Sequence, residues 1–318
     1  NSTITIIRSF AQENPIGFPL FLLLLALITY GIFITSLGFY WDDWPPLVVS
    51  HFSDPSSYWQ YFSYDRPFQS WTYYFLAPIC RDSAFLWQLS AIFFRWTSAL
   101  SLYFTFLHLF PQKRTILQWT AILFVVFPGF SDQYASVAYG SHFITYTVFG
   151  LSLLTMVLAI EQKKQFWVFF PLSLALTAVH LFTMEYFVGL ELLRPVILFI
   201  LHSEPERKKP KPFKYMLKYW APYLTVLAVY LYWRMVLYPA SMGGISDNYP
   251  FLFDNLIRAP FDTLVKFLEA VSADLRFLFI SSWTDRLFPP ELELGSITLW
   301  LSLLVGLATA AFLYIFLF

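Results

Sequence analysis

Residues 143–160 read FITYTVFGLSLLTMVLAI, an apolar stretch without a single charged side chain. A helix of that length rises about 27 Å, which is close to the hydrocarbon thickness of a bilayer. The stretch therefore predicts a helix that crosses a membrane, and the other apolar stretches of the chain can be compared with it.

The composition agrees with a membrane protein. Of 318 residues, 58% are hydrophobic, 22% are aromatic and only 13% are charged, whereas soluble domains carry about 25% charged residues. This excludes a disordered chain, a nucleic-acid binder with a basic face and an ordinary cytosolic enzyme. Twenty basic residues balance twenty acidic ones, so the net charge indicates no partner.

Eight apolar segments are predicted to cross the bilayer, and the third, fifth and sixth are short for a full span. No strand-like alternation of barrel type is present, so helices must satisfy the backbone in lipid. The sequence predicts an all-α polytopic membrane protein with spans at 18–39, 84–110, 115–130, 143–160, 166–182, 185–202, 216–238 and 296–318.

Three basic loops, at 112–114, 162–165 and 207–218, fall on one side of this arrangement. The positive-inside rule places that side in the cytoplasm. The prediction is a multi-pass protein of the cell (inner) membrane, with a cytoplasmic N-terminal segment (1–17) and a single transmembrane domain (18–318). Because the chain opens on Asn1 and stops inside an apolar run, we expect it to be part of a longer protein, truncated at its C-terminus.

Two long loops face outward, at 40–83 and 239–295. Aromatic stretches at 58–62 and 71–75 predict short helices at headgroup depth. Residues 255–283 alternate apolar and charged side chains with a helical period, which predicts a helix lying along the interface.

Asp42 and Asp43 directly follow the first span. Adjacent carboxylates repel each other, so at least one pKa is expected to be raised, as suits a general base. The alternative interpretation is a solvated pair that ends a helix, with Pro45 and Pro46 stopping it.

Arg66 begins the second aromatic helix, and Arg234 lies near the outer end of the seventh span. Both are candidates for binding a phosphate. The alternatives are an anchor to lipid headgroups for Arg66, beside Asp65, and a side chain that reaches the headgroups for Arg234.

Four further residues are candidates for a cavity on the outer face. Glu185 is an isolated carboxylate between two spans, which marks a functional position by default. His180 is close enough to share its cavity, although a buried histidine with one backbone bond is the commoner case. Tyr139 and His142, with Asp132 nearby, border the next outer loop.

Glu191 and Arg194 are spaced as a structural ion pair, and Arg95 needs a partner that the sequence does not name.

Several motifs are absent from the sequence. No P-loop or glycine-rich nucleotide fingerprint occurs, and no Glu-x-x-His or His-x-x-x-His spacing suggests a metal or haem pair. Cys80 is the only cysteine, so no disulfide can form within the chain. No nucleic-acid partner is expected.

The acidic pair Asp42-Asp43, Arg66-Pro67 with the helix after it, Glu185 and the Leu192-Leu193-Arg194-Pro195 turn resemble the GT-C superfamily of membrane glycosyltransferases. The chain looks similar to the bacterial branch related to protein O-mannosyltransferases and lipid A aminoarabinose transferases. The likeness covers most of residues 18–240.

That resemblance implies a polyprenyl-phosphate sugar as donor, delivered on the outer face, and inversion at the anomeric carbon. Asp42 or Asp43 would deprotonate an acceptor hydroxyl whose identity is open, Arg66 and Arg234 would stabilise the leaving phosphate, and Glu185 would orient the sugar. Membrane lipids would surround the isoprenoid tail. No cofactor is required, although some relatives use a divalent metal, and the acidic pair could hold Mg²⁺ or Mn²⁺.

A competing hypothesis is a non-catalytic subunit of a larger membrane complex, a scaffold in contact with lipids or pigments. His51, His108 and His142 would then be possible axial ligands. A transporter is a third hypothesis, but paired broken helices at mid-membrane are missing.

Overall fold

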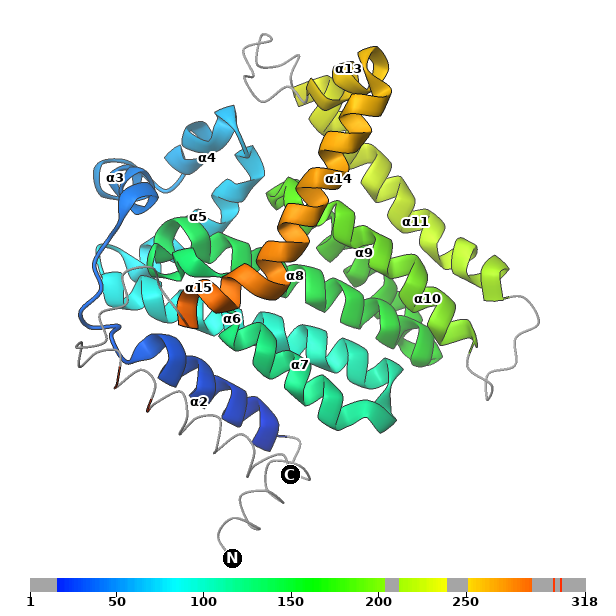
Figure 1. Cartoon of the computed structure of the whole chain (residues 1–318), viewed down its shortest axis with the longest axis horizontal. Coiled ribbons are helices and arrows are strands. Elements are labelled where there is room, and N and C mark those ends of the chain that lie inside the picture. Colours follow the sequence, from blue (N-terminus) through cyan, green and yellow to red (C-terminus); the bar gives the residue numbers. More distant parts are fainter. Residues whose placement is uncertain (1–15, 204–211, 239–250, 288–299, 301–303, 305–318) are drawn as a thin grey trace, which may run out of the picture. The chain divides into compact units, whose positions relative to one another are not determined.

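The computed structural model describes residues 16–203, 212–238 and 251–287, together with positions 300 and 304 (Figure 1). Every regular element in these residues is a helix, so the predicted all-helical class is confirmed for this part of the chain. The chain divides into two compact units. We call residues 22–126 and 132–246 the bundle unit, and residues 1–21, 127–131 and 247–318 the second unit.

The long helices of the bundle unit pack around α8, as can be followed in Figure 1. Helix α8 packs between α6 and α9, while α11 packs against both α9 and α10. Their bounds are α6 (Ala84–Leu109), α7 (Arg114–Val126), α8 (Ser136–Glu161), α9 (Phe166–Thr183), α10 (Leu193–Ser203) and α11 (Pro212–Tyr232), which continues into a π-helical turn at Trp233–Leu237.

Three helical stretches of the described residues are long and apolar enough to cross a membrane: Ser136–Glu161, Lys163–Thr183 and Glu185–Ser203. They coincide with the fourth, fifth and sixth predicted spans, and they support association with a membrane. The remaining five spans stay predictions, and most of the last one, at 296–318, lies outside the described residues.

Helix α6 is long enough for a span, but polar residues lower its hydropathy. Gln88, Arg95, Ser98, Ser101 and Thr105 are all buried. Polar side chains on a membrane helix pack against other helices rather than lipid. The polar positions of α6 therefore mark its protein-facing side.

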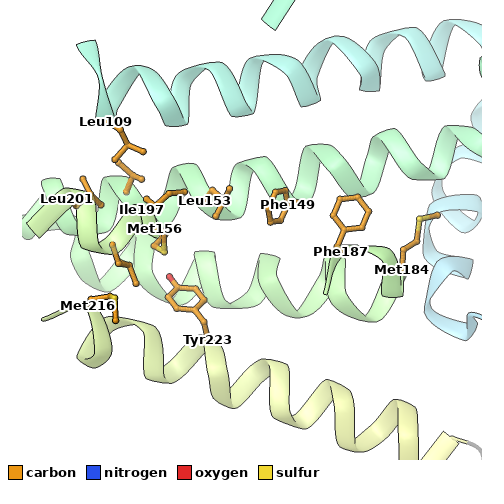
Figure 2. Packing of buried hydrophobic residues seen from close by; sticks show 12 residues of the cluster. Leu109, Phe149, Leu153, Met156, Met184, Phe187, Ile197, Leu201, Met216 and Tyr223 are labelled. Atoms are coloured by element: carbon orange, nitrogen blue, oxygen red, sulfur yellow. The ribbon is translucent and has the colours of Figure 1, made fainter. Parts of the chain in front are cut away.

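The core of the bundle unit lies where α6, α8, α10 and α11 meet (Figure 2). Phe149, Leu153 and Met156 form a row along α8, and Tyr223 of α11 reaches toward them. Burying a side chain of this size contributes about 1.5–3 kcal/mol, so this row ties the four helices together.

The predicted outer loop at 40–83 contains three short α-helices: α3 (Trp44–Phe52), α4 (Ser57–Tyr61) and α5 (Ser70–Cys80). The two aromatic stretches are helical as predicted. Helix α3 was not predicted, and one interpretation of the acidic pair had Pro45 and Pro46 stopping a helix. They instead occupy its first turn, where a proline loses no hydrogen bond.

Two predicted boundaries are wrong. Helix α2 (Gly17–Gly31) ends well before residue 39, since the chain turns at Gly31, whose carbonyl accepts a bond from the N–H of Ile34. The predicted helix at 255–283 is interrupted by Pro260. Helix α13 (Phe251–Arg258) ends before it and α14 (Pro260–Arg276) begins at it. A π-helical turn and α15 (Ser282–Leu287) follow.

Candidate functional site

Asp43 is a buried cap at the start of α8. Its Oδ1 accepts hydrogen bonds from the backbone N–H groups of Val137 and Ala138, both at 2.9 Å, and its Oδ2 accepts one from Tyr40 at 3.0 Å. The first N–H groups of a helix lack partners within the helix, and an anion there also interacts favourably with the helix dipole. Burial raises the pKa of the Asp43 carboxyl. The three backbone hydrogen bonds act to lower this pKa, and the charge of Asp42 acts to raise it. Asp43 therefore positions the chain.

We expect Asp43→Ala to lower the free energy of unfolding by about 2 kcal/mol, because it leaves buried N–H groups of α8 without an acceptor. Unfolding in mixed detergent micelles measures the change. Asp42→Ala is the matched control and should stay within about 0.5 kcal/mol of wild type, since Asp42 is exposed. Equal stability of the two variants would contradict the capping role.

Asp42 differs from its neighbour because its side chain reaches solvent. Its charge acts on the hydroxyl groups of Tyr61 and Tyr139, so it lies near both α4 and the start of α8. The preceding residue, Trp41, has φ of 36°, a conformation that costs a non-glycine residue about 1–3 kcal/mol. Of the two predicted carboxylates, Asp42 is the one that a substrate can reach.

Arg66 is bound by a fork of hydrogen bonds to Glu185, which lies 119 positions away in the sequence. Its Nε donates to both carboxylate oxygens at 3.1 Å and its Nη2 to Oε1 at 2.7 Å. Nη2 also donates to the Tyr186 hydroxyl at 2.8 Å, and Nη1 lies 3.0 Å from Asp65 Oδ2. Burial acts to lower the pKa of the Arg66 guanidinium, but the bonds to Glu185 and the charges of both carboxylates outweigh burial and raise it. Arg66 is therefore firmly cationic.

Arg234 joins the same place from the π-helical turn after α11. Its Nη1 donates to the backbone carbonyl of Asp65 at 2.9 Å, and its Nη2 lies 3.9 Å from Asp65 Oδ1. The Tyr238 ring lies below its guanidinium, 5.0 Å away, and the Tyr238 hydroxyl donates to the carbonyl of Ser63 at 2.6 Å. We call Asp65, Arg66, Glu185 and Arg234 the charge cluster. The structure thus brings together three of the predicted site residues, Arg66, Glu185 and Arg234.

Stacked rings connect the charge cluster to the start of α8. The Arg66 guanidinium lies 5.0 Å from the centre of the Tyr186 ring. Tyr186 stacks on His142 at 5.9 Å, and His142 stacks on Tyr139 at 5.5 Å. We call Tyr139, His142 and Tyr186 the aromatic ladder. No role was predicted for Tyr186, and its position next to Glu185 was the only available signal.

His180 does not contact the charge cluster. Its Nε2 lies 3.0 Å from Glu191 Oε1, and the same carboxylate accepts bonds from Arg194 Nε at 2.5 Å and Nη2 at 3.0 Å. Arg194 also donates to Ser152 Oγ at 2.7 Å and lies over the Tyr223 ring. The predicted Glu191–Arg194 pair is confirmed. His180 belongs with this pair, not with Glu185, because the side chain faces the interior of the bundle unit, where it is fully buried.

Arg95 is bound inside the bundle unit by groups that the sequence did not identify. Its Nε donates to Gln133 Oε1 at 2.9 Å, and its Nη1 donates to the carbonyl of Val125 at 2.9 Å and to the Tyr30 hydroxyl. The guanidinium also lies 4.4 Å from the centre of the Phe143 ring. These contacts tie α6 to α2, α7 and α8.

The remaining candidates have separate positions. His51 lies 3.2 Å from Asp82, and His108 lies 2.8 Å from Glu161. Asp132 is close enough to Tyr139 for its charge to act on that hydroxyl. Together with His142 in the aromatic ladder, the three histidines considered as axial ligands therefore lie in three different places.

An apolar groove of about 500 Å³ lies between α2, α5 and α6. The sequence did not indicate it, because its walls come from three separate segments. Its lining is Leu23, Leu27, Leu76, Ile79, Cys80, Leu86, Leu89, Ser90, Ile92, Phe93 and Phe94.

Backbone hydrogen bonds to Asp43 limit how the predicted acidic pair could hold a divalent metal. Both oxygens of Asp43 already accept backbone hydrogen bonds, which leaves Asp42 as the only available carboxylate of the pair. Within the described residues, no three His, Cys, Asp or Glu side chains gather as a metal site.

Comparison with known proteins adds no family: no protein-family model, no curated protein and no solved structure matches this chain.

Proposed function

We propose that this chain is a membrane glycosyltransferase. It transfers a sugar from a polyprenyl-phosphate donor to an acceptor hydroxyl on the extracytoplasmic face of a bacterial inner membrane, with inversion of the anomeric carbon. The observation that carries the proposal is the meeting of Arg66 and Arg234 at one place, with the aromatic ladder leading from Arg66 toward the part of the chain near Asp42.

The residues have distinct roles in this reaction. Asp42 removes the proton from the acceptor hydroxyl, whose oxygen then forms a bond to the anomeric carbon. The bond from that carbon to the phosphate oxygen breaks, and its electron pair stays on the phosphate. Arg66 and Arg234 stabilise the negative charge that develops there. Asp43 acts only as a positioning residue, because it holds the Asp42 turn to α8.

The aromatic ladder provides the surface for the sugar. The Tyr186 side chain is 60% exposed, and it lies between the phosphate-binding Arg66 and His142. A sugar ring presents apolar C–H faces that pack well on such rings. The isoprenoid tail is long and fully apolar, and the groove between α2, α5 and α6 offers it a surface of matching chemistry.

Arg234→Gln tests the proposal. We expect it to lower kcat for sugar transfer about a hundredfold, the cost of removing one charged donor from a developing anion. The assay uses the full chain in nanodiscs, radiolabelled polyprenyl-phosphate sugars and a panel of alcohol acceptors. Glutamine keeps an uncharged N–H donor at this position, which limits structural damage although its side chain is shorter.

Lys163→Gln is the control, because Lys163 is an exposed cation in the 162–165 loop and should leave kcat unchanged. Two results contradict the proposal: no donor loses its sugar in the presence of the wild type, or Arg234→Gln and Lys163→Gln transfer equally fast.

A non-catalytic membrane subunit is the second candidate, and one observation favours it. The two cations of the charge cluster are matched by two carboxylates, as expected of a structural network. In that case Arg234→Gln would lower stability in the absence of any turnover by the wild type.

A further inference from the structure

Glu185 binds Arg66 in the way that a phosphate group would. A guanidinium offers two parallel N–H groups, and carboxylates and phosphates both accept them as a fork. In this structure Glu185 occupies that fork through Nε and Nη2, at 2.7–3.1 Å. A donor phosphate that is to bind Arg66 in the same manner must take the place of the Glu185 carboxylate.

Glu185 also lies where a phosphate would meet both arginines. The charge of Arg234 acts on the Glu185 carboxylate in addition to that of Arg66. The Glu185 side chain is 31% exposed, so an opening to solvent lies beside it. It begins a single 3-10 turn at Glu185–Phe187, directly after the extended residue Met184. A change of rotamer moves the Glu185 carboxylate off Arg66 without any change in the backbone.

The charges of the cluster set the direction of the exchange. With Asp65 and Glu185 ionised and both arginines cationic, the four side chains sum to zero. When Glu185 leaves the fork, the three groups that remain in contact carry a net positive charge. That charge attracts an anion into the position that Glu185 has left.

We infer that Glu185 is an internal latch: its carboxylate occupies the phosphate-binding fork of Arg66 and is displaced by the phosphate headgroup of the lipid-linked donor. This inference rests on the proposed function and changes one part of the sequence-based expectation. In that expectation Glu185 orients the sugar, so the loss of its carboxylate weakens donor binding. As a latch it competes with the donor, so its loss strengthens donor binding.

Affinity for decaprenyl phosphate tests the latch, with the full chain in nanodiscs. We expect Glu185→Gln to bind decaprenyl phosphate about tenfold more tightly than wild type, the gain that follows if the fork is open in only about one wild-type molecule in ten. Glu185→Asp is the second variant. It keeps the negative charge but is too short to make the same fork, so it should also bind more tightly.

Glu161→Gln is the matched control, because it removes a carboxylate that pairs with His108 instead. Its affinity should equal that of the wild type. If wild type binds decaprenyl phosphate while both Glu185 variants bind it equally well or less tightly, the latch is wrong and the donor site remains. If wild type and all variants fail to bind it, the proposed function itself is overturned.

Inorganic phosphate separates the two sources of the headgroup. Binding of decaprenyl phosphate at concentrations at which inorganic phosphate does not compete supports a lipid donor. If inorganic phosphate binds as tightly and shows the same tenfold gain in Glu185→Gln, the site takes free phosphate and the lipid donor is overturned as the occupant.

Discussion

Asp42→Asn is expected to slow sugar transfer by a factor of at least about a hundred while the protein folds as the wild type does. A positioned general base contributes about 10²–10⁴ in rate, and an amide cannot take up the proton of the acceptor hydroxyl. Asp42 is exposed, and its charge reaches Tyr139 at one end of the aromatic ladder. The measurement is kcat at saturating donor, with a thermal unfolding curve for each variant.

Asp54→Asn is the matched control for this prediction. Asp54 is another exposed aspartate of the same outer loop, so the substitution removes the same charge at a different place. Its kcat should equal that of the wild type. Full turnover by Asp42→Asn, or equal losses in both variants, would show that Asp42 is not the base.

Arg194→Met is expected to lower the free energy of unfolding by about 3–5 kcal/mol, the range for removing one partner of a buried ion pair. Glu191 is 3% exposed and would keep only His180 as a partner. Replacing all three charged or polar groups should restore much of the loss, since well-packed apolar residues often substitute for a buried ionic cluster. The triple variant is His180→Leu with Glu191→Met and Arg194→Met.

Unfolding in mixed micelles measures both variants. Lys164→Met serves as control, because Lys164 is exposed and should change stability by less than about 0.5 kcal/mol. Two results would contradict the role given to His180, Glu191 and Arg194. In one, Arg194→Met is as stable as the wild type; in the other, the triple variant is less stable than Arg194→Met alone.

The apolar stretches located the helices of the bundle unit well, but not all of their ends. The run at 143–160 lies within α8, which begins at Ser136. Its first two turns are marked by Ser136, Gly140 and Ser141, all buried inside the protein. Hydropathy detects apolar side chains whether lipid or protein covers them, so it does not detect a helical turn that is built from small and polar residues. The cap at Asp43, more than ninety residues earlier, helps to set this start.

Of the predicted site residues, the structure places Arg66, Glu185 and Arg234 together, but the sequence did not predict their contacts. Arg66 and Arg234 were both predicted to bind a phosphate, and both lie at Asp65. The fork between Arg66 and Glu185 joins residues on different elements, and no local pattern predicts such a contact. Asp42 and Asp43 are neighbours with opposite surroundings, one exposed and one buried. Their difference depends on where α8 begins.

The polar face of α6 has a consequence for the synthesis of the protein. Arg95 lies near the middle of this helix, where an isolated arginine opposes insertion into a bilayer by about 2.5–3.5 kcal/mol. Three of the groups that surround it, in Val125, Gln133 and Phe143, come later in the chain. At typical translation rates they emerge on the order of seconds after Arg95. For the span that the sequence predicts in α6, we therefore expect the helix to remain beside the translocon until α8 arrives, so that the two enter the lipid together.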